Sequence, residues 1–329
     1  MRGFQWRREV LVCVLLVSWF AAGAGVVAEP PASGQRVKSL EITILSTMLA
    51  DEGFGEWGFA ALVEVDGRKI LFDTGAHEDT VQRNLEAMKL DLAGVELVVL
   101  SHNHEDHTTG LLPLRRQFAA RAPKALATAY AGEGLFWPRL TAAGEVNDRM
   151  RTIRREYEAT GAKVIDVTGP TEILPGVWLT GPVPRVHPER NWSSLGKVRT
   201  PAGEVEDTVP EDMTLVFRSE QGPVYLFGCG HAGVINTLEH ARRTIDPAIV
   251  QAVVGGVHLF SADDQHLAWT AGQLKAFGVR QFIGAHCTGI EAVYRIRELA
   301  GLTRQTCVVG AVGSSYSLAN GINAMRLAK

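Results

Sequence analysis

The chain has 329 residues, of which 46% are hydrophobic and 21% charged, and its formal net charge is −3. This composition is typical of a globular protein with a sizeable core, organised as one large domain or two small ones. The small net charge gives no general attraction to nucleic acid or to anionic membranes, so we expect no nucleic-acid partner.

The N-terminus has the pattern of a secretory signal peptide over residues 1–28. An arginine-rich start precedes an apolar run that ends in Val26-x-Ala28, which suits cleavage after Ala28. The pair Arg7-Arg8 resembles a twin-arginine export signal. An uncleaved anchor is the alternative, because the apolar run is nearly long enough to span a bilayer. We therefore expect an exported protein, periplasmic or secreted, without stable membrane association after cleavage.

A polar, proline-rich linker over residues 29–37 leads to a predicted domain over 38–329. Only three cysteines follow the expected cleavage site, too few for a disulfide framework in so large a domain, so stability must come from the core. The first half of the domain alternates apolar, β-branched runs with turn residues. It predicts strands over 39–47, 58–65 and 68–75, a helix over about 78–89, and further strands over 94–101 and 124–130.

Two irregular insertions interrupt this pattern. Residues 131–160 combine an aromatic loop with a charged, exposed helix, and residues 181–212 contain repeated prolines. Long loops in a compact domain are usually lids or interaction arms. We expect both insertions to overhang the site or a partner subunit, which leaves a homodimer open.

The second half repeats the strand-and-helix alternation. The whole chain therefore reads as two β-then-α halves, which predicts an α/β sandwich of two sheets with helices outside. The expected strands cover residues 213–219, 223–230, 248–256, 281–286 and 306–312, and the expected helices cover 232–245, 263–278 and 289–301.

A cluster of ionisable side chains follows the strand over 94–101. The stretch "SHNHEDHTTG" (101–110) leads into a predicted helix start, capped by Thr108 or Thr109. His102 and His104 are two residues apart, so in an extended segment their side chains face the same way. Imidazole and carboxylate are the ligands that zinc takes in open catalytic sites. Asp106 and His107 follow in the same string and are placed to face a second metal ion.

One loop cannot complete two coordination shells. His231 in "GCGHAG" and His286 in "GAHCTG" both follow predicted strands among small residues that permit close approach. Each alone could be a core histidine, but together with the cluster they favour metal ligation. His258 in "GGVHLF" also ends a strand, and we interpret it as a substrate contact or proton donor.

Taken together, these motifs resemble the metallo-β-lactamase superfamily. "LFDTG" (71–75) followed by "SHNHEDH" carries the resemblance to the superfamily. "DMTLVF", "GCGHAGVINT", "GGVHLF" and "GAHCTG", in that order, resemble its dihydropteroate-synthase-like branch, whose members include 7,8-dihydropterin-6-methyl-4-(β-D-ribofuranosyl)aminobenzene-5′-phosphate synthases. The likeness covers roughly residues 38–318 and implies an αββα sandwich of two mixed sheets with helices on the outer faces.

The resemblance also implies a binuclear zinc site, with Mn²⁺ or Fe²⁺ as alternatives. His102 and His104 would hold the first metal ion and Asp106 and His107 the second, with His231 and His286 joining from the far half. Asp73 would orient a histidine; a simple turn residue before Gly75 is the alternative.

This chain departs from the superfamily pattern in three places. "PED" (210–212) stands where a PGH histidine is usual, which makes Asp212 a candidate carboxylate ligand or substrate contact. "GCGH" stands where a bridging aspartate is usual, so the metal that His231 serves is left open. Asn103 and Thr109 replace glycines of the branch. Cys229 and Cys287 lie beside expected ligands. We expect them to be small buried side chains that pack behind residues 101–110, called here the metal loop, and we favour this role over thiolate ligation.

The expected function is an exported, binuclear metal-dependent hydrolase acting on a small-molecule substrate. A hydroxide activated by two metal ions would attack an ester, phosphoester or lactone, with Asp106 and His258 as catalytic residues. The branch name offers a pterin and aryl-phosphate synthase as an alternative. A non-catalytic metal-binding or ligand-binding module is a third interpretation.

Overall fold

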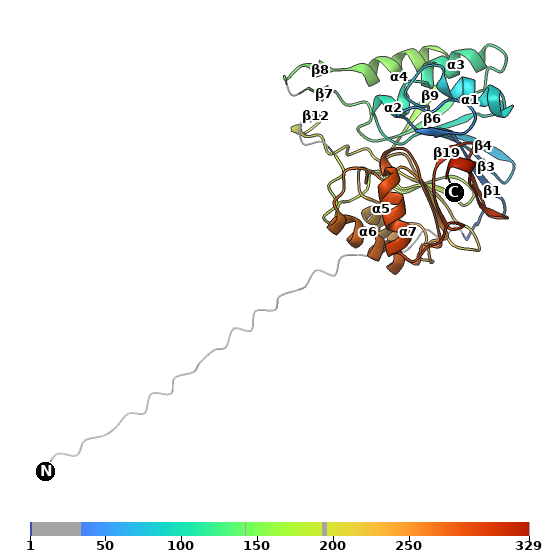
Figure 1. Ribbon diagram of the computed structural model, residues 1–329. Coiled ribbons are helices and arrows are strands. Elements are labelled where there is room, and N and C mark those ends of the chain that lie inside the picture. The colour runs from blue at the N-terminus through green and yellow to red at the C-terminus, as the bar shows by residue number, and fades with distance from the viewer. Residues whose placement is uncertain (2–33, 142, 193–195, 329) are drawn as a thin grey trace.

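The computed structural model describes residues 1, 34–141, 143–192 and 196–328. Two large β-sheets pack face to face, and helices cover the outer face of each sheet (Figure 1). This αββα arrangement confirms the predicted fold class. The expected signal peptide lies outside the described residues except for Met1. None of the helices among the described residues combines the length and the apolar character needed to span a bilayer.

The first sheet has eight strands. Its strands β4, β5, β6 and β9 run parallel to one another, and the others pair antiparallel. In spatial order they are β21 (Gly321–Asn323), β20 (Ser315–Ser317), β1 (Leu40–Ser46), β3 (Ala60–Val65), β4 (Arg68–Phe72), β5 (Leu97–Leu100), β6 (Thr128–Gly132) and β9 (Lys163–Val167).

The second sheet has seven strands and is also mixed. Strands β15 to β18 are parallel, whereas β10, β11, β14 and β15 pair antiparallel. Their order is β10 (Thr171–Leu174), β11 (Val177–Leu179), β14 (Leu215–Phe217), β15 (Val224–Phe227), β16 (Ala252–Gly255), β17 (Gln281–Gly284) and β18 (Cys307–Val309). A two-stranded ladder joins β2 (Leu49–Ala50) to β19 (Ala311–Val312).

Alternating side chains divide the core into three layers. On β4, Ile70 and Phe72 face the second sheet, and Leu71 between them faces the helices. On β15, Leu226 enters the same inter-sheet core and Tyr225 enters the layer beneath the opposite helices. Because successive side chains of a strand point to opposite faces, apolar runs produce sheets that are buried on both sides.

The helices follow the chain half to which they belong. The first sheet is covered by α1 (Thr80–Met88), α3 (Leu111–Ala119) and α4 (Arg149–Ala159), and the second by α5 (Val234–Thr244), α6 (Asp264–Ala276) and α7 (Ile290–Leu299). The short helix α2 (Glu105–Thr108) lies within the histidine cluster.

The predicted helix cap is wrong. Helix α2 starts at Glu105, directly after the extended His104, and α3 starts after Gly110. The hydroxyls of Thr108 and Thr109 instead donate to the carbonyls of His104 and Glu105, one helical turn back. Asp106 and His107 therefore lie in a short helix of their own, and His102 and His104 precede it in non-helical backbone.

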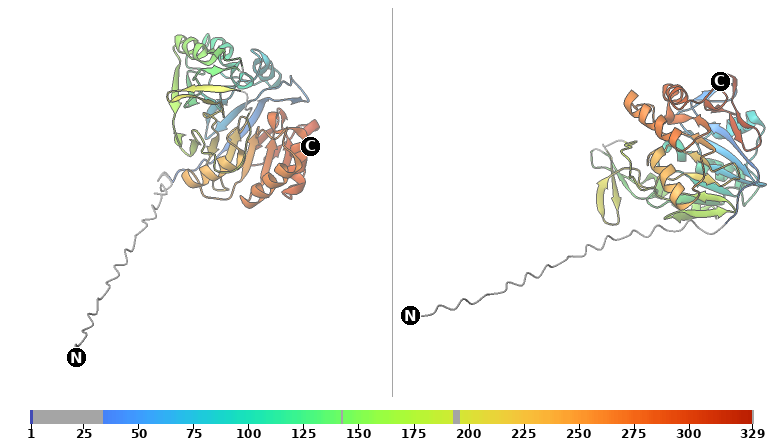
Figure 2. Two further views of the ribbon diagram at one scale, coloured as in Figure 1. Left: turned by 90° about the vertical axis from the view of Figure 1, so that its left-hand side faces the viewer. Right: turned by 90° about the horizontal axis from the view of Figure 1, so that it is seen from below.

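The two insertions meet in a small third sheet. Strand β7 (Arg139–Leu140) pairs with β8 (Val146–Asn147) and also with β12 (Lys197–Thr200), which pairs with β13 (Gly203–Glu206). This sheet, called here the insertion sheet, projects at the left of Figure 1 and in the right-hand view of Figure 2. Segments about 60 residues apart in the sequence thus form one element.

The fold begins before the predicted end of the linker. Val37 is buried and forms an isolated bridge with Ser219, and Arg36 pairs with Asp246 at 3.0 Å.

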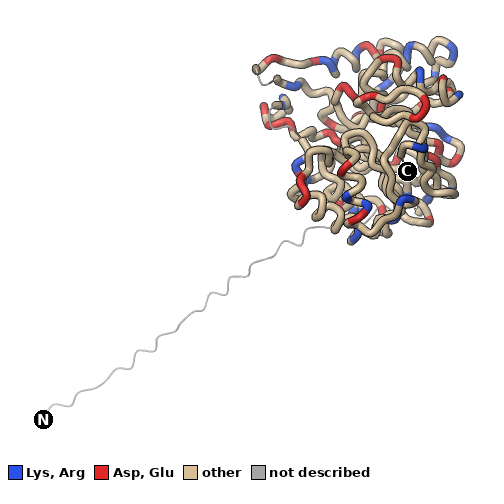
Figure 3. Tube along the Cα trace, viewed as in Figure 1, with Lys and Arg blue, Asp and Glu red and all other residues tan. Residues whose placement is uncertain are grey.

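Figure 3 shows acidic and basic residues interspersed over the visible trace.

Candidate metal centre

The candidate site lies where strands of both sheets end. His102 and His104 follow β5, and Cys229 and His231 follow β15. Strand β17 leads in the same way to His286. The carboxyl ends of parallel strands share one edge of a sheet, and ligand sites form there because the following loops are free to vary.

Three histidines form a first group. One ring nitrogen from each of His102, His104 and His231 lies within 4.8 Å of the others. Their ring centroids are 4.6 to 4.7 Å apart. The structure therefore brings His231 to the pair that was expected to hold the first metal ion.

Asp106, His107 and His286 form a second group with the same spacing. The Nε2 atom of His286 lies 3.2 Å from Asp106 Oδ2 and 3.2 Å from His107 Nε2. The expected ligands of the second metal ion thus converge, with His286 as the member from the far half of the chain. His102 and His107 rings are 4.2 Å apart, so the two groups are adjacent.

Hydrogen bonds fix which nitrogen each histidine offers. His107 Nδ1 lies 2.7 Å from Asp73 Oδ2. The Ser101 hydroxyl donates to the same Asp73 oxygen at 2.7 Å, so it must accept from His102 Nδ1 at 2.8 Å. His231 Nδ1 donates to the carbonyl of Asn191. In the neutral form of all three residues the lone pair is left on Nε2, the tautomer that a metal ligand requires.

The free nitrogens fit a divalent metal ion. The Nε2 atoms of His102 and His231 are buried and have no hydrogen-bond partner among the described residues. A buried polar atom without a partner is costly unless another group satisfies it. Neutral imidazoles grouped at this spacing, next to a carboxylate, match the donor set that zinc takes.

Burial keeps the first group neutral. It lowers the pKa of His102 and of His231 well below the ordinary value, and neighbouring histidines add to the effect. Burial also lowers the pKa of His104 to about 4. All three imidazoles are therefore deprotonated near neutral pH, which is the form that binds metal.

The second group carries more charge. Burial alone would lower the pKa of His107, but the Asp73 carboxylate outweighs it and raises the pKa to about 9. Burial opposes ionisation of Asp106, yet the hydrogen bond from His286 and the charge of His107 hold its pKa below the ordinary value. A cation at this position would take the place of the proton on His107.

Asp73 is held in an unusual backbone conformation. Its φ of 53° is in the left-handed region, which turns the side chain back under the metal loop. Besides His107 and the Ser101 hydroxyl, it accepts from the Ser101 backbone N–H at 2.7 Å. These are the contacts that an orienting residue needs, and they exceed those of a simple turn aspartate.

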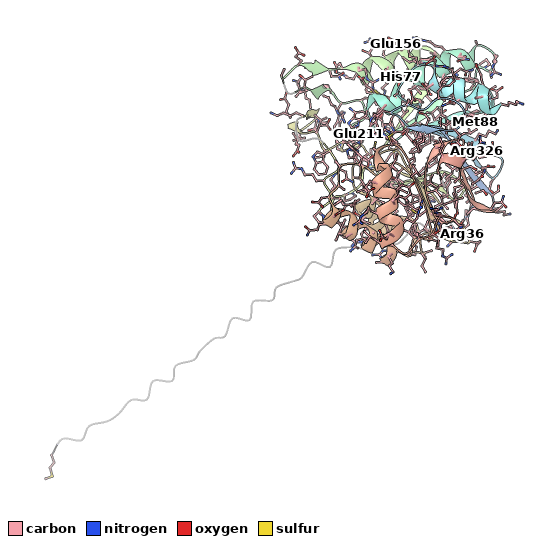
Figure 4. The ribbon with its side chains drawn as sticks, viewed as in Figure 1. Arg36, His77, Met88, Glu156, Glu211 and Arg326 are labelled. Atoms are coloured by element: carbon pink, nitrogen blue, oxygen red, sulfur yellow. The ribbon has the colours of Figure 1, made fainter. Side chains whose placement is uncertain are left out.

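A second carboxylate supports the loop from the other side. Glu211 accepts from the backbone N–H of Asn103 at 3.1 Å and from Arg139 at 2.6 Å. It is fully buried, and Figure 4 labels it between the upper and lower helix layers. The "PED" motif contains both carboxylates, but we predicted a role only for Asp212 and none for Glu211.

Asp212 lies outside both groups. Its Oδ2 atom accepts from the backbone N–H of Ala232 at 2.8 Å, and burial raises its pKa to about 7. It belongs to none of the candidate metal-binding groups among the described residues. Its contact is with the loop that carries His231, so it is placed to position that loop; we expected a carboxylate ligand or a substrate contact.

His258 borders the centre without joining either group. Its ring lies 4.5 Å from that of His231, and its Nδ1 atom is buried without a partner among the described residues. It groups with Cys229 and Cys287. His258 also lines a cavity of about 300 Å³ together with Asn191 and Trp192.

A second cavity borders the metal loop directly. It measures about 280 Å³ and is lined by His104, by Trp137 and Arg139 of the first insertion, and by Asp207 of the second. Both insertions therefore border the candidate site, as expected. An exposed aromatic pair, Trp57 and Phe260, was not anticipated; Trp57 packs against the ring of His286 at 4.9 Å.

Comparison with known proteins agrees with this geometry. The family model for the metallo-β-lactamase superfamily matches residues 58–191, the segment that contains the histidine cluster. This segment is therefore a metallo-β-lactamase domain. It is 26% identical over 273 residues to a 7,8-dihydropterin-6-methyl-4-(β-D-ribofuranosyl)-aminobenzene-5′-phosphate synthase of Methanocaldococcus jannaschii, covering 78% of this chain and 90% of the relative. The predicted resemblance to the superfamily and to this branch is confirmed.

Solved metallo-β-lactamase-fold proteins share the architecture. A metal-dependent hydrolase of the superfamily is 23% identical, with a TM-score of 0.66 over 84% of this chain and 98% of its own. Zinc-bound PqqB from Methylobacterium extorquens is 17% identical, with a TM-score of 0.51 over 84% and 99%. These likenesses establish the fold of this chain.

Proposed function

We propose that the protein is a metal-dependent hydrolase with two adjacent metal positions. His102, His104 and His231 would hold one ion, and Asp106, His107 and His286 the other. The observation that carries this proposal is the pair of adjacent donor groups, with buried, unpartnered Nε2 atoms on His102 and His231. Zn²⁺ suits these nitrogen and carboxylate donors, and Mn²⁺ or Fe²⁺ are the alternatives.

Two bound ions would supply Lewis acidity and lower the pKa of a water molecule. The chain would supply the proton acceptor and the orientation. Asp106 is suited to contact that water, because its side chain is 21% exposed whereas those of His107 and His286 are 0% exposed. His258 borders the centre and lines the cavity of about 300 Å³, and it would donate a proton to the leaving group.

The cavities favour a small substrate. Volumes of about 280 and 300 Å³ are near the lower end for ligand sites. Arg149, on the wall of the first cavity, is held by the carbonyl of Asn103 and the hydroxyl of Thr108, at 3.2 and 2.6 Å. A cation fixed next to the metal loop suits an ester, lactone or phosphoester, because each develops negative charge on oxygen during attack.

The decisive experiment combines metal analysis with isotope tracing. We expect close to two zinc ions per chain after mild dialysis, and a chelator-sensitive reaction on a panel of phosphodiesters, lactones, thioesters and β-lactams. In ¹⁸O-labelled water a hydrolase transfers the label to its product. The double variant His102→Ala/His104→Ala should lose both metal and turnover; full activity in that variant would refute the proposal.

A synthase is the second candidate, because a curated relative has that name. It would join a donor and an acceptor and leave the product without label from water. Metal binding with no turnover on either kind of substrate would instead favour a non-catalytic binding module. The same isotope experiment therefore separates the three interpretations.

We also propose that the chain is exported through its N-terminal segment and acts in the periplasm or outside the cell. Cell fractionation with an antibody to the folded domain would test this, and retention of the uncleaved chain in the cytosol would contradict it. A homodimer formed through the insertions stays a prediction, to be tested by light scattering.

A further inference from the structure

A buried cysteine lies between the two donor groups. The Sγ atom of Cys229 is 3.2 Å from His107 Nε2. The sulfur and one ring nitrogen each of His102 and His107 lie within 4.8 Å of one another. His102 belongs to the first group and His107 to the second, so the thiol of Cys229 reaches both.

The surrounding chain holds Cys229 in this place. It follows β15 with a glycine on each side, and a Cβ on Gly228 would lie 2.1 Å from the Ser101 hydroxyl. Gly230 adopts a positive φ of 61°. Because Gly228 and Gly230 have no side chains, the segment that carries Cys229 packs closely against the metal loop. The Cys229 side chain is thereby directed inward.

No carboxylate takes this position among the described residues. Asp106 groups with His107 and His286 but with no member of the first group. Asp212 already accepts from Ala232. An anionic ligand shared by two cations reduces their mutual repulsion, and Cys229 is the side chain placed to provide it.

On the basis of the proposed function, we propose that Cys229 is a thiolate ligand shared by the two metal positions. Zinc–sulfur and zinc–nitrogen bonds of about 2.3 and 2.0 Å at a tetrahedral angle separate the two donor atoms by about 3.5 Å. The observed separation from His107 is close to this value. A sulfur ligand would favour Zn²⁺ over Mn²⁺ or Mg²⁺. This inference replaces our expectation of a Cys229 that only packs behind the loop.

Cys287 has a different place. Its Sγ atom lies 3.2 Å from Cys229 Sγ and 3.7 Å from the Cys229 carbonyl. It groups with Cys229 and His258 and with no histidine of the two donor groups. Cys287 is therefore positioned to donate a hydrogen bond to the Cys229 sulfur, and it serves as the matched control.

Cobalt(II) substitution tests the proposal without any substrate. A thiolate bound to Co²⁺ produces a charge-transfer absorption in the near ultraviolet. We expect this band in the full-length, cobalt-loaded protein and its loss in Cys229→Ser. That variant should still bind cobalt, with an affinity about tenfold lower. Cys287→Ser should keep the band, and so should Cys307→Ser, because this buried cysteine belongs to none of the candidate metal-binding groups among the described residues. Cys13 is present in every variant and contributes equally.

The outcomes separate this proposal from the proposed function. Two bound cobalt ions without the band in the wild-type protein, or a band that persists in Cys229→Ser, would overturn the thiolate ligand alone. A disulfide between Cys229 and Cys287 in the metal-loaded protein would overturn it as well. No cobalt binding at all would overturn both proposals. If Cys229→Ser does not fold, zinc X-ray absorption of the wild type decides: a sulfur scatterer at about 2.3 Å is expected.

Discussion

Single residues decide how the candidate centre presents its nitrogens. Asp73 is the common acceptor: it binds His107 directly and reaches His102 through the hydroxyl of Ser101. Each histidine is thereby held in the tautomer that leaves Nε2 free. The carboxylate thus acts on both donor groups although it belongs to neither.

Replacing Asp73 with Asn should weaken metal binding by about 10- to 100-fold. The amide has one acceptor oxygen where the carboxylate has two, so His107 would lose its acceptor and rotate or change tautomer. Competition with a chromogenic chelator measures the affinity. Asp91→Asn, which alters an exposed ion pair with Arg121, is the matched control and should leave the affinity unchanged. Equal affinities for both variants would contradict the orienting role.

His258→Ala should leave the metal content intact and slow the reaction by about 100-fold, the usual effect of losing a general acid. The reason is its place: the ring borders the centre and a cavity without joining either donor group. Elemental analysis and the rate on the best substrate of the panel check the two parts separately. Loss of one metal ion would make His258 a ligand instead.

At the scale of elements, a carboxylate caps the helix that follows the His231 loop. Glu189, from the second insertion, accepts from the backbone N–H groups of Ile235 and Asn236 at 3.1 and 2.7 Å, in the first turn of α5. Burial raises its pKa to about 7 despite these hydrogen bonds. The insertion and the helix are therefore linked through one titratable group.

This contact predicts a pH-dependent stability. Between pH 4.5 and 7 the folded chain keeps a proton on Glu189 that the unfolded chain has released, so the free energy of unfolding falls as the pH rises through this window. The total loss is roughly 3 kcal/mol at 1.36 kcal/mol per pH unit. Glu189→Gln cannot release this proton. Urea unfolding at several pH values, with chelator present throughout, should show a steeper fall for the wild type; parallel curves would contradict the assignment.

The sequence predicted the elements better than their connections. Strand ends and buried histidines were predictable because apolar runs followed by small and ionisable residues mark the edge of an α/β sheet. Local sequence does not encode which distant groups will meet. The pairing of His231 with His102, the contact of Glu211 with Asn103, and the approach of Cys229 to His107 all depend on tertiary packing.

The insertion sheet shows the same limit. Prolines and polar residues in the second insertion predicted an irregular arm, yet β12 and β13 form there because β7 offers an unpaired edge. Two-residue strands such as β7 and β8 carry no pattern of their own. Strand β8 pairs with the nearby β7, and β7 pairs in turn with β12 about 60 residues away.

For the whole molecule, the candidate centre joins the two halves of the chain. His102, His104, Asp106 and His107 come from the first sheet, and His231 and His286 from the second. A metal ion that binds only when both sheets are in place stabilises the folded state through its binding free energy. The apolar core between the sheets and the bound metal ions would thus both stabilise the contact between the two sheets.

Chelation should therefore lower the thermal midpoint of unfolding by on the order of 5 °C, and added Zn²⁺ should restore it. Differential scanning calorimetry of the loaded and chelated protein measures the shift. The double variant His102→Ala/His104→Ala is the control, because it should melt at one temperature with or without chelator. A wild-type midpoint that does not respond to chelator would mean that the ions do not link the sheets.

The insertion sheet also has a consequence for the evolution of related chains. Strand β7 belongs to one insertion and β12 to the other, and each supplies the hydrogen-bonding partner of its neighbour. A related chain that kept only one insertion would lose the ladder between β7 and β12 and keep a single two-stranded hairpin, which is marginally stable in water. The two insertions should consequently have been gained and lost as a pair, so that homologues possess either both or neither.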